Sequence, residues 1–306
     1  MRLSEEALLA ALHAWPLREP RLVQRLPGGF TSDVWRVEAG GNAFAAKYTE
    51  QPQGAFEGGL AAAELAEHAG ISSGAPLRTK EGALSLVVEG PDGQHHPLAL
   101  LHFVPGAPVN RAEPGAASLY GHLLGWTHRL FLDNGLVEQI PADLYTFLHE
   151  DDAFVDAQPG LADLIQEAYE AARADAARRA VTYGVIWADR MEIVREQETG
   201  RVGIIDWGAI ERGPLLFDVA LTGLWLFPRG SRAYDTFLDA YIAAAPIARS
   251  ELDGLRYYEA LLWARQAKYF AYRVGAGVTL GNSDSRTNTE RLAEARQALE
   301  RVLTTM

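Results

Sequence analysis

Residues 181–208 have the sequence VTYGVIWADRMEIVREQETGRVGIIDWG, and this stretch decides the fold that the chain is expected to adopt. The pattern predicts a loop, followed by two short strands at residues 191–195 and 201–205 that are joined by a turn. Gly200 in that turn can take a positive φ angle at little cost. The second strand ends in two isoleucines, and Asp206 follows directly. An acid placed after a buried strand presents a carboxylate at the edge of a cleft, or else caps the next turn of a surface hairpin.

The composition describes an acidic chain without cysteine. It has 306 residues, of which 48% are hydrophobic, enough for one large domain or two smaller ones. A formal net charge of −12 disfavours nonspecific binding to nucleic acid or to a membrane. The absence of cysteine excludes disulfides, thiolate nucleophiles and cysteine–zinc sites. Glu5 and Glu6 interrupt any signal-peptide pattern, and no apolar run approaches the ~18 residues of a membrane span, so we expect a cytoplasmic protein.

The first third of the sequence has the patterns of strands, with one helix inserted among them. A helix over residues 4–14 comes first, and Pro16 ends it. A second helix, over residues 54–70, follows the third strand and ends at a glycine. Five strands are predicted, at residues 21–25, 33–38, 42–48, 84–89 and 98–104.

A loop with two glycines connects the first two strands. Gly28 and Gly29 would let backbone N–H groups approach phosphate oxygens, and Ser32 completes the loop. Lys47, in the third strand, would supply a compact positive charge to the same phosphates. The loop alone favours an ordinary hairpin turn, but together with Lys47 and the later Asp206-Trp207-Gly208 the layout is typical of a nucleotide-clamping lobe.

The remainder of the chain has mainly helical periodicity. His128, in the first of these helices, is expected to be a structural histidine. Residues 133–160 are irregular and rich in acids and aromatics, which indicates either a solvated face or a surface that recognises a cationic acceptor. Helices are predicted at residues 116–132, 161–179, 220–227, 233–244, 251–272 and 289–302.

These motifs and their order resemble the aminoglycoside phosphotransferase / choline kinase-like family, a branch of the protein-kinase-like fold. That family carries H-G-D-x-x-x-x-N, a short hairpin and then I-D-[WFY]-G, and Asp206-Trp207-Gly208 matches the last motif. The resemblance implies an α+β fold with two lobes. The small lobe, residues 1–105, would hold a five-stranded antiparallel sheet with one helix. The large lobe, residues 106–306, would be mainly helical.

The resemblance also implies roles for individual residues. Glu57, favoured over Glu64 on the same helix face, would hold the nucleotide-binding lysine. Phe103 and Val104 would line the adenine slot, with ordinary strand-end packing as the alternative. Asp218 would tie the catalytic loop down, or else cap a helix. The implied nucleotide-binding set is Gly28, Gly29, Ser32, Lys47, Glu57, Phe103 and Val104, and the implied metal ligand is Asp206.

The first family motif fits poorly when it is laid on the chain without a gap. Its histidine then falls on Tyr183, its catalytic aspartate on Val185 and its metal-binding asparagine on Arg190. Val185 cannot accept a proton, and the cationic Arg190 would repel Mg²⁺ and contact a phosphate or Asp206 instead. Loss of a positioned general base typically lowers a rate by about 10²–10⁴. In this alignment, Asp189 lies past the reacting centre.

The resemblance therefore implies an ATP-dependent phosphotransferase, similar to aminoglycoside, choline or homoserine kinases, with impaired catalysis. It would move the γ-phosphate to a hydroxyl of a small molecule, with ATP and Mg²⁺ as cofactors, although Arg190 argues against the metal. The alternative is a catalytically inactive, pseudokinase-like protein that binds a nucleotide or another ligand. A third possibility is a structural partner protein with an empty cleft. No nucleic-acid or membrane partner is expected.

Overall fold

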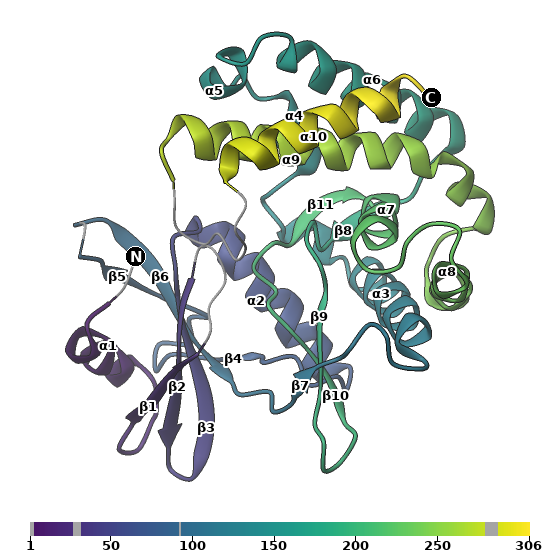
Figure 1. Ribbon diagram of the computed structural model, residues 1–306. Helices are drawn as coiled ribbons and strands as arrows, with labels where there is room; N and C mark the ends of the chain where they lie inside the picture. Colours follow the sequence, from purple (N-terminus) through teal and green to yellow (C-terminus); the bar gives the residue numbers. More distant parts are fainter. Residues whose placement is uncertain (1–2, 27–31, 92, 279–286) are drawn as a thin grey trace. The chain divides into compact units, whose positions relative to one another are not determined.

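The computed structural model describes residues 3–26, 32–91, 93–278 and 287–306 (Figure 1). Its contacts divide the chain into two compact units. Unit 1 consists of Met1–Val109 and Met191–Ala209, and unit 2 consists of Asn110–Arg190 and Ile210–Met306. The boundary after residue 105 stays a prediction; the division by contacts adds the hairpin after Met191 to the first unit.

Unit 1 is built on an antiparallel sheet that has six strands among the described residues, where five were predicted. The additional strand, β4, is two residues long, which is too short for an alternating pattern to reveal. The order is β1-β2-β3-β6-β4, and β5 also pairs with β6. The strands are β1 (Arg21–Leu26), β2 (Ser32–Ala39), β3 (Asn42–Thr49), β4 (Pro76–Leu77), β5 (Leu86–Glu89) and β6 (His95–His102).

Helix α1 (Glu5–Ala11) lies beside the sheet and closes its core (Figure 1). Ser4 caps this helix, because its Oγ accepts a hydrogen bond from the N–H of Ala7 at 3.1 Å. The helix ends earlier than expected, since residues 12–14 form a 3₁₀ turn. Apolar side chains that alternate along β2, β3 and β6 pack against it. The buried members of this core are Leu8, Leu12, Trp15, Val37, Ala39, Phe44, Ala46, Tyr48, Leu98 and Leu100.

The predicted hairpin is present as β9 (Glu192–Arg195) and β10 (Val202–Ile205), and β7 (Ala107–Pro108) pairs with β9. The turn that follows β10 packs on helix α2 (Gln53–His68). A Cβ atom at Gly59 of α2 would lie 2.2 Å from the carbonyl oxygen of Trp207, so only glycine fits there. This contact fixes the end of the hairpin against α2 within unit 1.

Unit 2 is mainly helical. Residues 133–160, predicted to be irregular, contain the two short helices α4 and α5. Helices α9 and α10 lie side by side (Figure 1). None of the helices in the described part of the chain is both long enough and apolar enough to cross a bilayer. The helices are α3 (Ala116–Asp133), α4 (Leu144–His149), α5 (Ala153–Asp156), α6 (Leu161–Arg179), α7 (Leu216–Trp225), α8 (Arg232–Ala244), α9 (Leu255–Gly275) and α10 (Asn288–Leu303).

The stretch before the hairpin contains a strand that was expected to be a loop. Strand β8 (Tyr183–Ile186) pairs antiparallel with β11 (Glu211–Pro214), and Val185 lies opposite Arg212. Val185 and Ile186 are β-branched and 2% and 0% exposed, so burial favours the extended backbone. The prediction of a loop was therefore wrong for these four residues, and the true loop begins at Trp187.

Candidate functional site

Each unit has its own group of candidate functional side chains, and the two groups are described separately. In unit 1, β3 carries Lys47 and the turn after β10 carries Asp206. The Nζ of Lys47 donates a hydrogen bond to Oδ1 of Asp206 at 2.7 Å. The lysine side chain is only 12% exposed, whereas Asp206 is 53% exposed. The positive charge of Lys47 lowers the pKa of the Asp206 carboxyl, and this outweighs the effect of its partial burial.

The backbone around Asp206 is held in an unusual conformation. Asp206 has φ +62°, in the left-handed region that non-glycine residues rarely occupy. The next residue anchors it: Trp207 is 6% exposed, and its Nε1 donates to the carbonyl oxygen of Ser73 at 2.8 Å. Nε2 of Gln51 donates to the carbonyl oxygen of Gly208 at 2.5 Å. Local strain that the surroundings hold in this way is common at functional sites.

Protonation of Asp206 gives a first prediction. Because its pKa is lowered in the folded protein, the stabilisation it provides is present above the unfolded-state pKa of about 3.9 and is lost as the pH falls through the lower, folded value. We expect the melting temperature of wild type to exceed that of Asp206→Asn by a small margin at pH 7, and the margin to narrow below about pH 4. Thermal denaturation between about pH 3 and pH 7 measures this.

The matched control is the same substitution in a Lys47→Met background. Without the lysine, the pH-dependent difference between Asp206 and asparagine should disappear, because the charge that lowers the pKa is gone. A difference of unchanged size in that background would show that Lys47 is not its cause.

The structure does not bring together all the residues that the sequence predicted for the nucleotide site. Glu57 does not contact Lys47: its Oε1 accepts from Oγ of Ser85 at 2.6 Å and from Nε2 of Gln53 at 3.1 Å. The acid that pairs with Lys47 in the described part of the chain is Asp206. Glu64, the less favoured glutamate, pairs with an arginine of the same unit. The predicted lysine–glutamate pair is therefore absent in this conformation.

The other predicted residues of this group have ordinary local contacts. The hydroxyl of Ser32 donates to that of Thr49 at 3.1 Å across the β2–β3 pair. Phe103 continues the β6 edge, and its ring lies 5.0 Å beneath the guanidinium of Arg36. The side chain of Val104 packs against Gly203. A Cβ atom added at Gly203 would lie only 2.5 Å from Cγ1 of Val104. Gly28 and Gly29 lie outside the described residues.

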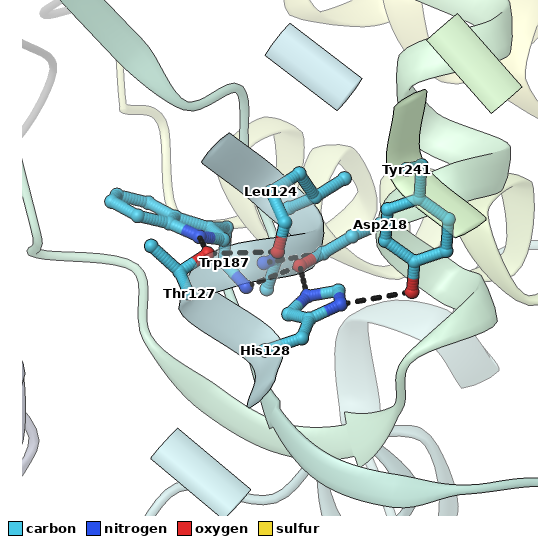
Figure 2. Close-up of polar contacts among 7 residues, drawn as sticks. Leu124, Thr127, His128, Trp187, Asp218 and Tyr241 are labelled. Atoms are coloured by element: carbon cyan, nitrogen blue, oxygen red, sulfur yellow. Dashed lines mark hydrogen bonds and ion pairs between the residues drawn. The ribbon is translucent and has the colours of Figure 1, made fainter. Parts of the chain in front are cut away.

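In unit 2, a buried carboxylate anchors the loop after β8 (Figure 2). Asp218 is 2% exposed and lies in α7, so it does not cap that helix. Its Oδ2 accepts from the N–H of Trp187 at 2.7 Å, and its Oδ1 accepts from the N–H of Ala188 at 3.2 Å. Asp218 thus fixes the two backbone amides that precede Asp189.

Two further side chains extend this anchor. Nε2 of His128 lies 3.0 Å from Oδ2 of Asp218, and its Nδ1 lies 3.0 Å from the hydroxyl of Tyr241 (Figure 2). Since a carboxylate only accepts, the consistent arrangement has Nε2–H donating to Asp218 and the tyrosine O–H donating to Nδ1. His128 and Tyr241 are 1% and 0% exposed. The prediction of a structural histidine fits this geometry, whereas Tyr241 was not predicted at all.

Asp189 occupies the exposed position directly after the anchored amides. Its Oδ1 accepts from the N–H of Arg190 at 2.7 Å. Its charge also acts on Arg265, which pairs with Glu211 at 2.6 Å. Burial lowers the pKa of the Arg265 guanidinium, but the charges of Glu211 and Asp189 more than offset this, so Arg265 is cationic.

The anchored backbone leads to Asp189 and not to Val185, the residue on which the family's catalytic aspartate was aligned. Val185 lies inside β8, is 2% exposed and presents nothing to a ligand. The order Trp187-Ala188-Asp189 has the bulky, small and acidic side chains of the family's H-G-D in the same sequence. The alignment without a gap does not pair these three residues with that motif.

Hard oxygen ligands are the groups that suit Mg²⁺, and unit 1 provides two carboxylates near each other in the sheet register. Glu192 lies opposite Ile205, the residue that precedes Asp206. Among the described residues, no three acidic, histidine or cysteine side chains gather as a metal-binding group. Two carboxylates fit an ion that takes its remaining ligands from phosphates and water.

Comparisons with known proteins agree on the kind of fold. A family model described as "Phosphotransferase enzyme family" matches residues 22–258. An amicoumacin kinase, solved with AMP-PNP, Ca²⁺ and Ami, is 13% identical, with a TM-score of 0.72 over 99% of this chain and 94% of that one. A comparison with curated protein sequences found no match.

Two further solved structures show the same likeness. A choline/ethanolamine kinase family protein from Mesorhizobium loti is 18% identical, with a TM-score of 0.63 over 98% of this chain and 97% of that one. Aminoglycoside 2'-phosphotransferase-IIIa, as a GDP complex, is 12% identical, with a TM-score of 0.59 over 98% of this chain and 97% of that one. At these identities the likeness shows a shared fold.

Proposed function

The chain belongs to the phosphotransferase enzyme family, and we propose that it is an ATP-dependent kinase that transfers the γ-phosphate to a hydroxyl group of a small molecule. The main support for this proposal is that the Asp218 carboxylate accepts hydrogen bonds from the backbone amides of Trp187 and Ala188. These bonds position Asp189 at the start of an exposed loop. Phosphoryl transfer depends mainly on positioning and charge neutralisation, and an anchored acid supplies the positioning.

Asp189 would orient the acceptor hydroxyl and receive its proton as the oxygen attacks the γ-phosphorus. In the family motif, five residue steps separate the aspartate from the asparagine that follows it. Here three steps separate Asp189 from Glu192, so the loop is two residues shorter. Glu192 then stands at the start of β9, where the asparagine would precede its strand.

Lys47 would bind the phosphate oxygens of the nucleotide through its ammonium group. Asp206 and Glu192 would hold Mg²⁺, which, when bound, neutralises charge on the β- and γ-phosphates. Asp206 is well prepared for this role, because the neighbouring lysine keeps its carboxyl ionised. The nucleotide complexes of the similar structures, with AMP-PNP and GDP, support a nucleotide as the donor.

A second candidate function is that of a catalytically inactive nucleotide-binding relative. The expectation of impaired catalysis depended on Val185 at the catalytic position and on Arg190 at the metal-binding position, and the burial of Val185 in β8 argues against the first of these placements. One observation still favours inactivity: Arg190, a cation, follows Asp189 directly in the shortened loop. Turnover decides between the two candidates.

Nucleotide binding can be measured without knowing the acceptor. We expect ATP with Mg²⁺ to raise the melting temperature of wild type more than ATP alone, because the two carboxylates bind nucleotide better through a metal. A ligand at 100 times its Kd stabilises a protein by about 2.7 kcal/mol, which a thermal-shift titration detects. Lys47→Met should lose most of the shift, whereas Lys80→Met, which removes an exposed lysine of the same unit, should keep it.

The outcomes separate the parts of the proposal. No shift with ATP under any condition would contradict nucleotide binding. An equal shift with and without Mg²⁺ would contradict the metal role of Asp206 and Glu192. ATP consumption is then measured across amino alcohols, aminoglycosides and sugars. Normal ATP binding without acceptor-dependent turnover would support the inactive relative.

A further inference from the structure

A pocket of about 600 Å³ lies in unit 2, between α4, α6 and the first residue of β8. Four rings line it, those of Tyr145, Tyr169, Tyr183 and His149, together with Arg173 of α6 and with other polar and small aliphatic side chains. A concave site with aromatic walls and a few polar groups is the usual form of a small-molecule site. Nothing in the proposed phosphoryl transfer uses these residues.

The rings form an ordered set. Tyr145 stacks with Tyr183, with centroids 6.1 Å apart and planes 16° from parallel. Tyr169 meets Tyr145 edge to face at 5.6 Å and 89°. The guanidinium of Arg173 lies 5.2 Å from the Tyr145 centroid and 5.9 Å from that of Tyr169. A guanidinium stacked in this way keeps its N–H edge available to donate two parallel hydrogen bonds to an oxyanion.

The charges of the pocket decide the sign of its ligand. The carboxylate of Asp143 is already occupied: it accepts from the N–H of Thr146 at 2.9 Å and from the hydroxyl of Tyr183, and Arg212 lies 3.6 Å away. Arg173, by contrast, has no carboxylate within ion-pair distance in the described part of the chain, and its contacts there are with the two rings. Of Asp143 and Arg173, it is therefore the positive charge that has no ionic partner there.

The pocket lining contains a second acid, Glu150. Glu150 follows α4 and, like Arg173, is exposed, so water and salt screen both charges. Arg173 is held over two rings, and a fixed donor binds an anion better than a freely moving one because less conformational entropy is lost. The geometry thus favours an anion at the arginine over a cation at the edge of the pocket.

The pocket is separate from the loop that carries Asp189. Tyr183 begins β8 and Ile186 ends it, so three residue steps of roughly 3.3 Å, about 10 Å in total, separate the pocket from the end of the strand that leads into the loop. Helix α4 presents different side chains to the two regions. Phe147 lies 5.8 Å from the guanidinium of Arg265, the residue that Asp189 influences, whereas Tyr145 lines the pocket.

We propose that this pocket binds a small aromatic carboxylate, whose carboxylate pairs with the guanidinium of Arg173 and whose ring packs against the tyrosine rings that line the pocket. The carboxylate matches the planar N–H edge of the arginine. The body of the ligand matches the aromatic walls through offset or edge-to-face ring contacts. The site would operate independently of the kinase reaction proposed above.

The probe is benzoate, titrated calorimetrically into the full-length protein without nucleotide. We expect saturable binding at one site, weaker binding of benzyl alcohol, and no binding of benzyltrimethylammonium, which has the same ring and the opposite charge. Arg173→Gln should weaken benzoate binding about tenfold or more, because a charged hydrogen-bonded contact is lost. Tyr169→Leu should weaken it about two- to fivefold through the loss of ring contact and of support for the arginine.

The control is Arg256→Gln, which removes an exposed arginine of the same unit and should leave benzoate affinity unchanged. Absence of benzoate binding to wild type would overturn the proposal. So would equal affinity in Arg173→Gln, since the ligand would then lie elsewhere. Tighter binding of benzyltrimethylammonium than of benzoate would also overturn it and identify a cation site. None of these results depends on ATP, so failure here is distinguishable from failure of the kinase assignment.

Discussion

Replacing Asp189 by asparagine is expected to lower acceptor-dependent turnover by about 10²–10⁴-fold while the stabilisation by ATP stays unchanged. Asparagine has nearly the same shape but cannot take the hydroxyl proton. The side chain is exposed and its position is set by the backbone, since Asp218 holds the two preceding amides. The loop should therefore keep its conformation, and the loss should appear in kcat with little change in KM for ATP.

The measurement is coupled-assay kinetics with whichever acceptor supports turnover in wild type. Asp133→Asn is the matched control, because it makes the same change at an exposed aspartate of unit 2 at the end of α3. Its turnover should equal that of wild type. If Asp189→Asn retained wild-type turnover, the acid that accepts the proton would have to be another residue, and the assignment of the loop would be wrong.

Asp218→Asn is expected to lower the free energy of unfolding by roughly 3 kcal/mol, because charged hydrogen bonds are lost in the interior. An asparagine side chain can accept from one of the two amides, but its NH₂ group would face a donor. His128 would also lose its ionised partner. Turnover should fall as well, since the backbone before Asp189 is no longer fixed.

Urea denaturation measures the stability, and Tyr241→Phe is the comparison. That variant removes one hydroxyl from the outer end of the same network and leaves both amide contacts in place. It should cost about 1 kcal/mol and leave turnover near normal. Should Asp218→Asn prove no more damaging than Tyr241→Phe, the carboxylate would not be the anchor of the loop.

Local patterns in the sequence predicted most of the secondary structure. Helix α6 has the predicted bounds, residues 161–179, because its periodicity is uninterrupted and glycine and alanine in left-handed conformations end it on either side. The hairpin β9–β10 follows from its turn and its β-branched residues. The family resemblance is confirmed by the match over residues 22–258, and the α+β kinase-like fold by the similar structures.

Contacts between distant parts of the chain could not be predicted in the same way. Tyr241 reaches His128 across 113 residues of sequence, and no local pattern encodes that hydrogen bond. Glu57 was assigned to Lys47 by position alone, whereas Ser85, 28 residues away, takes its carboxylate. The alignment without a gap put the catalytic aspartate at Val185, which the structure places inside β8. The anchoring of the backbone before Asp189 depends on Asp218, 31 residues from Trp187, and no local pattern predicts that contact.

The direct contact between Lys47 and Asp206 has a consequence for which form of nucleotide the proposed kinase would bind. The Asp206 carboxylate is held beside Lys47 by the fold and therefore has a high effective concentration there. A free phosphate in solution has to compete with it for the lysine. A metal-free nucleotide must displace it and also meets its negative charge. A metal complex instead offers the carboxylate a new partner at the moment when the lysine is released. In the proposed kinase, the ion pair would therefore discriminate against nucleotides that arrive without their metal, before any chemistry takes place.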